Sequence, residues 1–389
     1  MRSTTNPSLP EPDDAARDHS ACVLAAVRAE IERRGGWIPF AGYMQVVLYA
    51  PGLGYYVAGA RKFGAAGDFV TAPETTPLFA QALAVQLGSI LAATAMREIV
   101  EFGAGSGALA ADLLNALANL EALPSRYAIL EVSPDLRERQ RATIARRAAD
   151  HAARVEWLDA LPATIDGAVV MNEVLDAIPP HLISRRRGEW FERGVAGTDT
   201  LRWEDRPLTD EWLRASAAGR FPATGDYSSE INPAAEALIE DVGQRMTAGA
   251  LLVIDYGFPQ LEFYHVQRSD GTWMGHYRHH AHSDPFLWPG LSDLTAHVDF
   301  TAIALAGERA GLQVAGYAPQ AAFLLGCGIL DRLRECGDPK SMTYLREAVA
   351  VQKLTSPAEM GELFKVLALA KSEAIAWPGF AVADRSHRL

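Results

Sequence analysis

Two carboxylates three residues apart, Glu173 and Asp176, are the residues of this 389-residue sequence whose types and spacing most directly suggest chemistry. They follow the apolar run GAVVM and precede Pro179-Pro180. On a helical turn, side chains three apart share a face, so this pair can hold a guanidinium through bidentate hydrogen bonds. The pair can also orient a nitrogen lone pair and accept the proton that an attacking nitrogen loses. The alternative is that both residues only cap or solvate the start of a short helix.

A glycine-rich turn upstream supplies a candidate cofactor site. The segment IVEFGAGSGALAADLL places Gly103, Gly105 and Gly107 between an apolar run and an amphipathic one. Glycines at such a junction permit a tight turn and let a ligand approach the backbone, while the next helix offers unpaired N–H groups. With Ala108, the same glycines also fit the GxGxxG/A dinucleotide fingerprint. An NAD-dependent oxidoreductase and a purely structural turn therefore stay open at this point.

Three acids near the ends of expected strands bear on which ligand this loop holds. Glu131 ends the second apolar run, where a carboxylate accepts hydrogen bonds from the ribose hydroxyls of an adenosine cofactor. Asp159 ends the third run and could accept a hydrogen bond from the adenine amino group. Glu101, two residues before the first glycine, would repel a pyrophosphate but favour an amine or a sulfonium. The set is typical of a class I methyltransferase that uses S-adenosylmethionine (SAM), although each acid alone could be a solvated strand end.

Histidines are concentrated in one stretch, since six of the ten lie between residues 265 and 297. In GHYRHHAHSDPF, the pairs His276/His280 and His279/His282 have the spacing of ligands on a helix, and histidine often binds transition metals. The stretch nevertheless lacks an HExxH arrangement and any cysteine, and Asp284 is its only carboxylate. Metal binding and an ordinary polar loop are the two interpretations.

The elements that must position these residues alternate from residue 97 onward. Strands are expected over 97–103, 126–132, 154–159, 166–174 and 250–258, and helices over 107–120, 134–149 and 233–249. Continuous apolar strands separated by helices indicate a parallel sheet covered on both faces, so the predicted fold class is α/β with a doubly wound, Rossmann-like core. The glycine loop and the acids then lie at the carboxyl ends of strands, where such sheets bind ligands.

Three ranges are expected along the chain. Residues 1–18, rich in Pro, Asp and Ser, are predicted to be disordered. Residues 19–96 form a mainly helical portion, with helices over 21–34 and 76–95, and residues 97–389 form the core. Insertions follow the fourth and fifth strands, at 181–228, where hairpin strands precede a helix near 211–220, and at 259–297, which is rich in loops.

Composition and charge exclude several classes of protein. The net charge is −12 and the only compact basic run is Arg185–Arg187, which argues against a nucleic-acid partner. The three cysteines show no CxxC spacing, so neither a disulfide framework nor a cysteine zinc site is expected. No apolar run is long enough to span a bilayer, and residues 1–21 resemble neither a signal peptide nor a mitochondrial presequence. We expect a soluble, cytoplasmic protein.

Five segments in a fixed order resemble the MidA-like methyltransferases, a family that includes the mitochondrial complex I assembly arginine methyltransferase. They are GDFVTAPETTPLFAQAL, VEFGAGSGALAADLL, MNEVLDAIPPHLI, LLVIDYGF and HYRHHAHSDPFLWPGLSDLTAHVDFTAIA. The resemblance runs from about residue 20 to the C-terminus. It implies a class I methyltransferase core, SAM as the cofactor and a protein substrate. The activity implied is symmetric dimethylation of an arginine, in the 49-kDa-type subunit of NADH dehydrogenase or another protein.

The resemblance also implies roles for single residues. It assigns the three glycines to the cofactor loop and Glu131 to the ribose. Asn172 and the two carboxylates fall on the family's Asn/His-Glu-x-x-Asp stretch, and Glu74 of TAPE is placed near the cofactor or the substrate. Gly275, His279 and His282 match a Gly-x-x-x-His-x-x-His pattern with no metal implied, which makes His279 a candidate for substrate contact or proton handling.

Two further alternatives remain at this stage. A non-catalytic assembly chaperone could retain the fold of a methyltransferase without turnover, although an intact glycine loop with Glu101 and Glu131 argues against it. The assembly could be a homodimer or a monomer.

Overall fold

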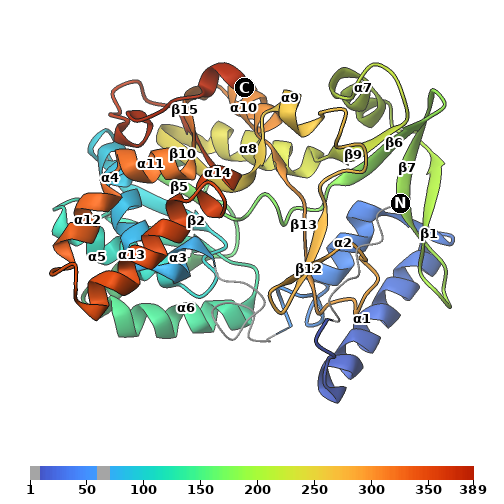
Figure 1. Cartoon of the computed structure of the whole chain (residues 1–389), viewed down its shortest axis with the longest axis horizontal. Helices are drawn as coiled ribbons and strands as arrows, with labels where there is room; N and C mark the ends of the chain where they lie inside the picture. Colours follow the sequence, from blue (N-terminus) through green and yellow to red (C-terminus); the bar gives the residue numbers. More distant parts are fainter. Residues whose placement is uncertain (1–8, 59–70) are drawn as a thin grey trace. The chain divides into compact units, whose positions relative to one another are not determined.

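The computed structural model describes residues 9–58 and 71–389 of the chain (Figure 1). Contacts divide these residues into two compact units, each built from separate stretches of sequence. The smaller unit consists of the described residues up to 58 together with 176–234 and 261–297. The larger unit consists of 71–175, 235–260 and 298–389.

The larger unit is built around an eight-stranded sheet in the order β15-β16-β10-β5-β2-β3-β4, with β14 beside β10. The strands are β2 (Glu98–Phe102), β3 (Arg126–Leu130), β4 (Val155–Leu158), β5 (Ile165–Asn172), β10 (Met246–Phe258), β14 (Val298–Asp299), β15 (Gln313–Pro319) and β16 (Phe364–Ala370). Strands β10, β5, β2, β3 and β4 run parallel, whereas β16 runs antiparallel to β10 and β15. The chain runs from β2 outward to β4 and returns to β5 on the other side of β2. Open α/β sheets bind ligands at the carboxyl ends of strands beside such a reversal.

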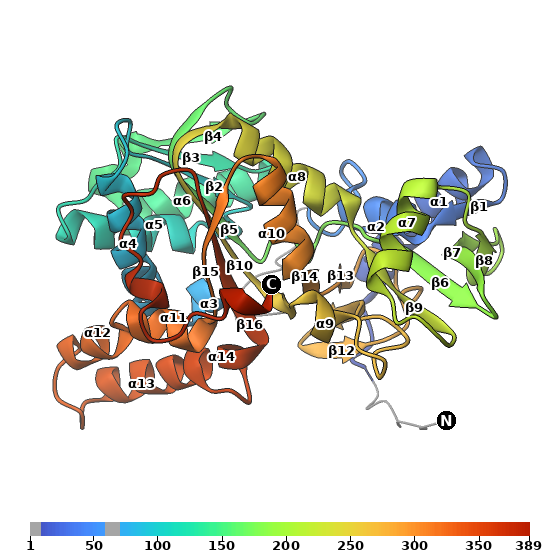
Figure 2. The same ribbon diagram turned by 90° about the horizontal axis from the view of Figure 1, so that it is seen from above.

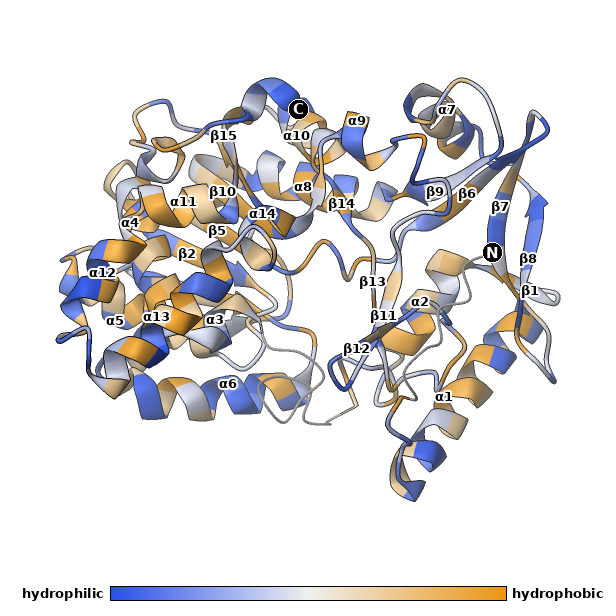
Figure 3. Cartoon of the chain, in the orientation of Figure 1, coloured by the Kyte–Doolittle hydropathy of each residue, from blue (hydrophilic) through white to orange (hydrophobic). Residues whose placement is uncertain are grey.

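Helices cover both faces of this sheet, with α4 and α5 on one face and α8 and α10 on the other (Figure 2). The helices are α3 (Ala72–Thr75), α4 (Pro77–Ala92), α5 (Ala108–Asn119), α6 (Pro134–Arg147), α8 (Pro233–Arg245), α10 (Phe300–Arg309), α11 (Gln320–Gly326), α12 (Ile329–Glu335), α13 (Met342–Thr355) and α14 (Met360–Leu363). Every residue of β2 is buried, and Figure 3 shows the central strands as predominantly hydrophobic. The uninterrupted apolar runs arise because both faces of these strands are covered. The predicted doubly wound α/β fold is therefore confirmed.

The smaller unit contains a five-stranded antiparallel sheet and a three-stranded one. The first comprises β1 (Trp37–Pro39), β6 (His181–Arg186), β7 (Glu189–Ala196), β8 (Arg202–Pro207) and β9 (Tyr227–Ile231), and the second β11 (Met274–Tyr277), β12 (His280–His282) and β13 (Asp293–Thr295). Helices α1 (Asp14–Arg33), α2 (Phe40–Tyr49) and α7 (Glu211–Arg220) belong to this unit, and the short α9 (Gln260–Phe263) begins at its boundary. The core packs Val27, Phe40 and Met44 of the helices against Val195 of the sheet.

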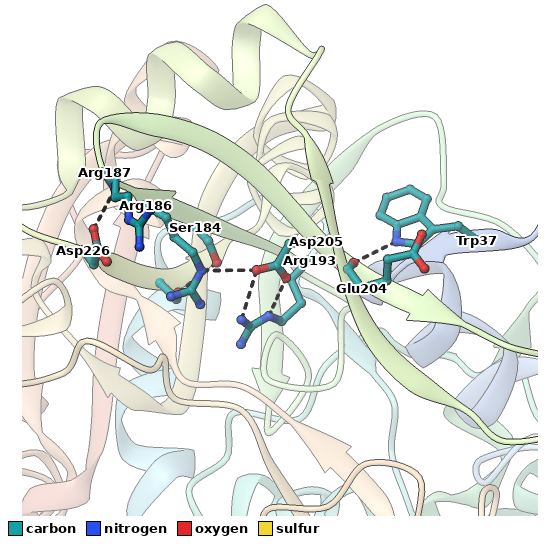
Figure 4. Close-up of polar contacts among 9 residues, drawn as sticks. Trp37, Ser184, Arg186, Arg187, Arg193, Glu204, Asp205 and Asp226 are labelled. Carbon is teal, nitrogen blue, oxygen red and sulfur yellow. Dashed lines mark hydrogen bonds and ion pairs between the residues drawn. The ribbon is translucent and has the colours of Figure 1, made fainter.

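The basic run Arg185–Arg187 lies on the β6–β7 hairpin. Arg186 and Arg193 both contact the carboxylate of Asp205, at 3.3 and 2.8 Å (Figure 4). Burial opposes ionisation of Asp205, but hydrogen bonds and charge from the two arginines outweigh it and lower the pKa of this carboxyl. The side chain of Arg185 donates to the carbonyl oxygens of Pro222 and Gly225. The side chains of Arg185 and Arg186 are therefore bound within the smaller unit, while Arg187 is exposed at the hairpin turn.

Helix α1 begins at Asp14, so the prediction of disorder over 1–18 is wrong from that residue onward. Asp13 caps the helix by accepting a hydrogen bond from the backbone N–H of Ala16 at 2.9 Å. Arg17 pairs with Asp14 one turn earlier and with Glu11. Part of the segment that we predicted to be disordered from its Pro, Asp and Ser content is thus a helix start, while residues 1–8 lie outside the described part of the chain.

Three other boundaries differ from the expected ones. Residues 71–96, including α4, pack with the larger sheet rather than with the preceding helices. The expected helix over 233–249 ends at Arg245, and β10 begins at Met246 with an irregular register before Ala248. The stretch expected to be mostly loop, 259–297, contains the three-stranded sheet.

Candidate active site

The glycine loop follows β2 and leads into α5, at the carboxyl edge of the larger sheet beside the reversal. Gly103, Gly105 and Gly107 all have positive φ, of 59°, 51° and 80°. At Gly107 a side chain would also clash, because its Cβ would lie 2.9 Å from Cα of Gln140 on α6. At Gly103, which is exposed, the only described residue that a Cβ would meet is Val174, at 3.7 Å. Gly107 therefore packs the loop against α6, while Gly103 remains open to a ligand.

Glu101 lies on β2 directly below this loop and is fully enclosed. Its Oε2 accepts a hydrogen bond from the hydroxyl of Tyr127 at 2.7 Å. Burial raises the pKa of Glu101 to about 7, with the charge of Glu131 adding to the rise and the Tyr127 hydrogen bond opposing it. Near neutral pH this carboxyl is consequently divided between its acid and its anion, and a cation nearby would favour the anion.

Glu131 and Gln140 form a hydrogen-bond network that joins the loop to β3. Glu131 accepts hydrogen bonds from the backbone N–H of Ser133 and from Nε2 of Gln140, both at 2.9 Å. Gln140 also donates to the carbonyl oxygen of Gly105 at 3.1 Å and accepts from Nε1 of Trp157 at 2.8 Å. Burial is the main cause of a raised pKa at Glu131. The network fixes the carboxylate and the glycine loop relative to each other.

The ends of β3 and β4 are joined by Arg137. Its guanidinium donates to the carbonyl oxygens of Glu131 and Leu158 and pairs with the carboxylate of Asp159, each at 2.7 Å. The side chain of Asp159 is 92% exposed. Val132, directly after Glu131, is 68% exposed and places an apolar side chain at the same edge. Asp159 therefore lies next to the ribose candidate, but it already accepts from a cation of the protein.

Asn172 and Glu173 mark the carboxyl end of β5. Glu173 has a φ of 53°, and its N–H donates to the carbonyl oxygen of Ile254 on β10 at 2.9 Å. The expected helical turn across Glu173 and Asp176 is therefore wrong, because β10 draws the chain into a left-handed conformation at Glu173. Nδ2 of Asn172 donates to Oε1 of Glu173 at 3.2 Å, while its buried Oδ1 has no hydrogen-bond partner among the described residues. Such an atom is a candidate acceptor for a ligand.

Asp176 belongs to the smaller unit, where acids and tyrosines are gathered. The hydroxyl of Tyr56 donates to Oδ1 of Asp293 at 2.8 Å. Burial, followed by the charges of Asp293, Tyr49 and Asp176, raises the pKa of Tyr56 well above its ordinary value. The ring of Tyr49 stacks on that of Tyr56 at 5.5 Å, and its hydroxyl donates to the carbonyl oxygen of Ala177. This acidic-aromatic cluster of Tyr49, Tyr56, Asp176 and Asp293 suits a cation by charge and by its ring faces.

The histidine-rich stretch forms the β11–β12 hairpin, so its side chains follow the period of a strand and not that of a helix. Gly275 lies directly opposite His282, whose ring passes so close that a Cβ on Gly275 would be 2.4 Å from it. Nε2 of His282 lies 2.9 Å from Oγ of Ser292. Burial lowers the pKa of His282 and of His276. These contacts make His282 a packing residue, whereas His279 is exposed at the two-residue turn.

Metal and membrane features can be stated for residues 9–58 and 71–389 only. Within them, no group of three or more histidine, cysteine, aspartate or glutamate side chains is arranged to hold a metal ion. In the same part of the chain, no helix is both long and apolar enough to cross a bilayer.

Comparison with known proteins decides the family. The sequence model described as "Putative S-adenosyl-L-methionine-dependent methyltransferase" matches residues 81–318, which is more than half of the chain. The chain belongs to this family. It is 30% identical to the mitochondrial protein arginine methyltransferase NDUFAF7 of Mus musculus, over 86% of this chain and 81% of that protein. The Caenorhabditis elegans homologue is also 30% identical, over 87% and 84%.

A solved structure gives the same answer for the fold and the cofactor. A "likely methyl transferase" from Burkholderia thailandensis, bound to S-adenosyl-homocysteine, is 50% identical and superposes with a TM-score of 0.94. The match covers 98% of this chain and 100% of that one. The predicted MidA-like family and the predicted use of SAM are confirmed, and the NAD-dependent alternative loses its basis.

The residues of the larger unit fit SAM. When bound, SAM supplies an electrophilic methyl group on a positively charged sulfur. Glu131 is held beside the glycine loop through Gln140. Among the described residues, Gly103 leaves the loop open and Oδ1 of Asn172 is a buried acceptor without a donor. Glu74 lies on α3, which contacts α4 and α5, while residues 67–70 of its motif fall outside the described residues. The specific roles of all these side chains stay predictions.

Several residues of this methyltransferase were missed by reasoning from sequence. Gln140 had a detectable signal, since it lies at helical spacing between Leu136 and Ile144 on the buried side of α6. A polar residue on an apolar stripe needs internal partners. Asp293 and Tyr56 had no such signal, because their contact joins segments 237 positions apart.

Proposed function

We propose that this methyltransferase transfers methyl groups from SAM to the side-chain nitrogens of an arginine in a protein substrate. Relatives named as protein arginine methyltransferases align over most of the chain, which supports the substrate class. The observation that carries the proposal is the carboxylate of Glu173 at the end of β5, which accepts a hydrogen bond from Nδ2 of Asn172. A carboxylate is an acceptor, so it favours a substrate that brings N–H donors and positive charge.

In this proposal the carboxylates take separate roles. Glu173 orients the attacking nitrogen and accepts its proton, which then passes to water. Asp176 and His279 belong to the smaller unit. Their roles, in binding the guanidinium for Asp176 and in substrate contact or proton relay for His279, stay predictions from the family resemblance. The new bond joins the arginine nitrogen to the methyl carbon, the carbon–sulfur bond breaks with its electrons staying on sulfur, and S-adenosyl-homocysteine leaves. The contribution of the protein is mainly positioning and charge placement.

The finer parts of the proposal follow the family resemblance. They are symmetric dimethylation of the two ω-nitrogens, a respiratory complex I-type subunit as the substrate, and a location in the bacterial cytoplasm. The net charge of −12 agrees with a substrate segment that carries basic residues.

The test begins with the pure protein, SAM labelled in its methyl group, and lysate of the source cells. Label should appear on arginine in one or a few peptides, and mass spectrometry identifies the peptide and the methylated nitrogens. Label on lysine, carboxyl or a small molecule would refute the arginine assignment. A protein that binds SAM by calorimetry yet labels nothing would instead be a non-catalytic chaperone.

Two variants test the site itself. Glu173→Gln should bind SAM almost normally and lose about a hundredfold in turnover, because a positioned base typically contributes that much. Gly105→Val should abolish SAM binding, since valine disfavours the φ of 51° and blocks the approach to the loop.

A matched control separates strain from blockage. Gly225 in the smaller unit also has positive φ, of 88°, and no atom of the described residues lies within 4 Å of its Cβ position. Gly225→Val should therefore cost stability without changing the affinity for SAM. Normal binding by folded Gly105→Val, or unchanged turnover by Glu173→Gln, would remove the corresponding residue from the proposed site.

A further inference from the structure

Asp255 is a fully buried carboxylate near the carboxyl end of β10, and no role in chemistry has been assigned to it. Its Oδ1 accepts a hydrogen bond from the N–H of the next residue, Tyr256, at 2.9 Å. Its Oδ2 accepts one from the N–H of Leu175 at 3.0 Å. Leu175 lies two residues beyond Glu173, so the side chain of Asp255 connects β10 to the segment that follows β5.

The segment is held at two successive points of β10. The N–H of Glu173 donates to the carbonyl oxygen of Ile254, and the N–H of Leu175 donates to the side chain of Asp255. Between these bonds Glu173 adopts a φ of 53°, a left-handed conformation that residues other than glycine, asparagine and aspartate rarely adopt. A strained conformation persists only where surrounding contacts impose it. The two hydrogen bonds are contacts of that kind.

The chemistry of the position requires a carboxylate. Two N–H donors converge on its two oxygens, and an asparagine could accept only one of them, because its NH₂ group would face the other donor. The residue directly opposite in the ladder is Lys365, which is also buried. Nζ of Lys365 donates to the carbonyl oxygens of Glu362 and Leu363. A neutral residue at position 255 would lose the second hydrogen bond.

We infer that Asp255 is a positioning residue: it locks the turn after β5 so that Glu173 keeps the left-handed conformation that directs its carboxylate. This inference rests on the proposed function for the part that concerns turnover. Asp255 itself acts through the backbone of Leu175 and not on the substrate.

The experiment compares Asp255→Asn with the full-length wild type. The turnover number of Asp255→Asn should fall about tenfold to a hundredfold below that of the wild type. This is the loss expected when a catalytic group is displaced by a fraction of an ångström to one ångström. The affinity for SAM by calorimetry should stay within about twofold, since the glycine loop and Glu131 are untouched. Asp112→Asn is the matched control: Asp112 is a buried aspartate of the same unit that pairs with Arg147, and its loss should lower thermal stability with turnover per folded molecule unchanged.

A double variant distinguishes positioning from general damage. If Asp255 acts through Glu173, Asp255→Asn should lower turnover little further in a Glu173→Gln background, because residues that act as a unit are strongly non-additive. An equal additional loss in both backgrounds would overturn the inference, and so would an Asp255→Asn protein with wild-type turnover.

A measurement without turnover keeps this inference separate from the proposed function. Hydrogen exchange at the Leu175 amide should be slow in the wild type and markedly faster in Asp255→Ala, which removes both acceptor oxygens. If the wild type transfers no methyl group, the proposed function fails, but the exchange test still decides whether Asp255 holds the turn after β5. Should Asp255→Asn fail to fold, Asp255→Glu keeps both acceptors one methylene further out and should show the same loss of turnover. Rapid exchange at the Leu175 amide in the wild type would by itself refute the inference that Asp255 holds this turn.

Discussion

Replacing Arg278-His279 with Asn-Gly separates the two roles open to the histidine hairpin. These residues form the two-residue turn between the paired Tyr277 and His280, with φ of 44° and 64°. Type I′ turns need positive φ at both central positions, and Asn-Gly is their preferred pair. Each non-glycine residue in a left-handed conformation costs about 1–2 kcal/mol, so the exchange should relieve roughly 2 kcal/mol in the hairpin.

The assay reads the local stability and the turnover of the same protein. A gain of roughly 2 kcal/mol should slow hydrogen exchange of the β11 and β12 amides about thirtyfold where exchange proceeds by local opening. Methyl transfer should nevertheless fall about tenfold or more, because the imidazole of His279 is removed. The reasoning is refuted if the hairpin is stabilised and methyl transfer is unimpaired, since His279 would then only serve the turn.

The β6–β7 hairpin supplies the control. Its turn, Arg187-Gly188, has φ of 52° and 86°, so Arg187→Asn creates the same Asn-Gly pair elsewhere in the smaller unit. This variant should gain local stability and keep full activity. A loss of activity in both hairpins would mean that stiffening, and not the missing imidazole, is responsible.

Two further predictions concern the cofactor side. Gln140→Leu leaves the carbonyl of Gly105 and the carboxylate of Glu131 without their shared donor, at about 1–3 kcal/mol for each, and should weaken SAM binding about tenfold or more by calorimetry. The control is Gln86→Leu, which removes an equally buried glutamine that is hydrogen-bonded to two backbone groups. It should lower stability and leave the affinity for SAM unchanged. Equal effects of the two substitutions on the affinity would contradict the role of Gln140. Burial is the main cause that raises the pKa of Glu101 from 4.5 to about 7, so the folded protein favours the protonated carboxyl. The resulting stabilisation of the fold is complete below pH 4.5 and is lost as the pH rises through 7. Between pH 5 and pH 8, the unfolding free energy of Glu101→Gln should therefore rise by about 2–3 kcal/mol relative to the wild type in urea melts, and a constant difference would contradict the raised pKa.

The sequence predicted correctly those helices and strands whose buried residues recur with a helical or strand period along the chain. The strands that became β2, β3 and β5 were predicted within two residues, and the helix over Glu211–Arg220 coincides with α7. The glycine loop was predicted because its conformation depends on residue type at adjacent positions. Such features are encoded within a window of a few residues.

The remaining features depend on partners far away in the chain. The left-handed conformation of Glu173 follows from hydrogen bonds to β10, about eighty positions later, so spacing alone suggested a helical turn instead. The start of α1 was missed because an acidic, proline-containing segment has the composition of disorder, although Asp13 is a good N-cap. In both cases composition or spacing was overridden by a specific hydrogen bond.

A family motif combines positions with different physical duties, and the structure separates them by whether their atoms are satisfied internally. In Gly-x-x-x-His-x-x-His, Gly275 and His282 serve each other, since the ring of one occupies the space that a side chain of the other would need. In the glycine loop, Gly107 is likewise required by the backbone of Gln140. Asn172 differs, because its buried oxygen has no donor among the described residues. Substitutions of the first kind should lower stability and those of the second kind ligand binding, so one melting curve and one binding isotherm for each variant suffice to tell them apart.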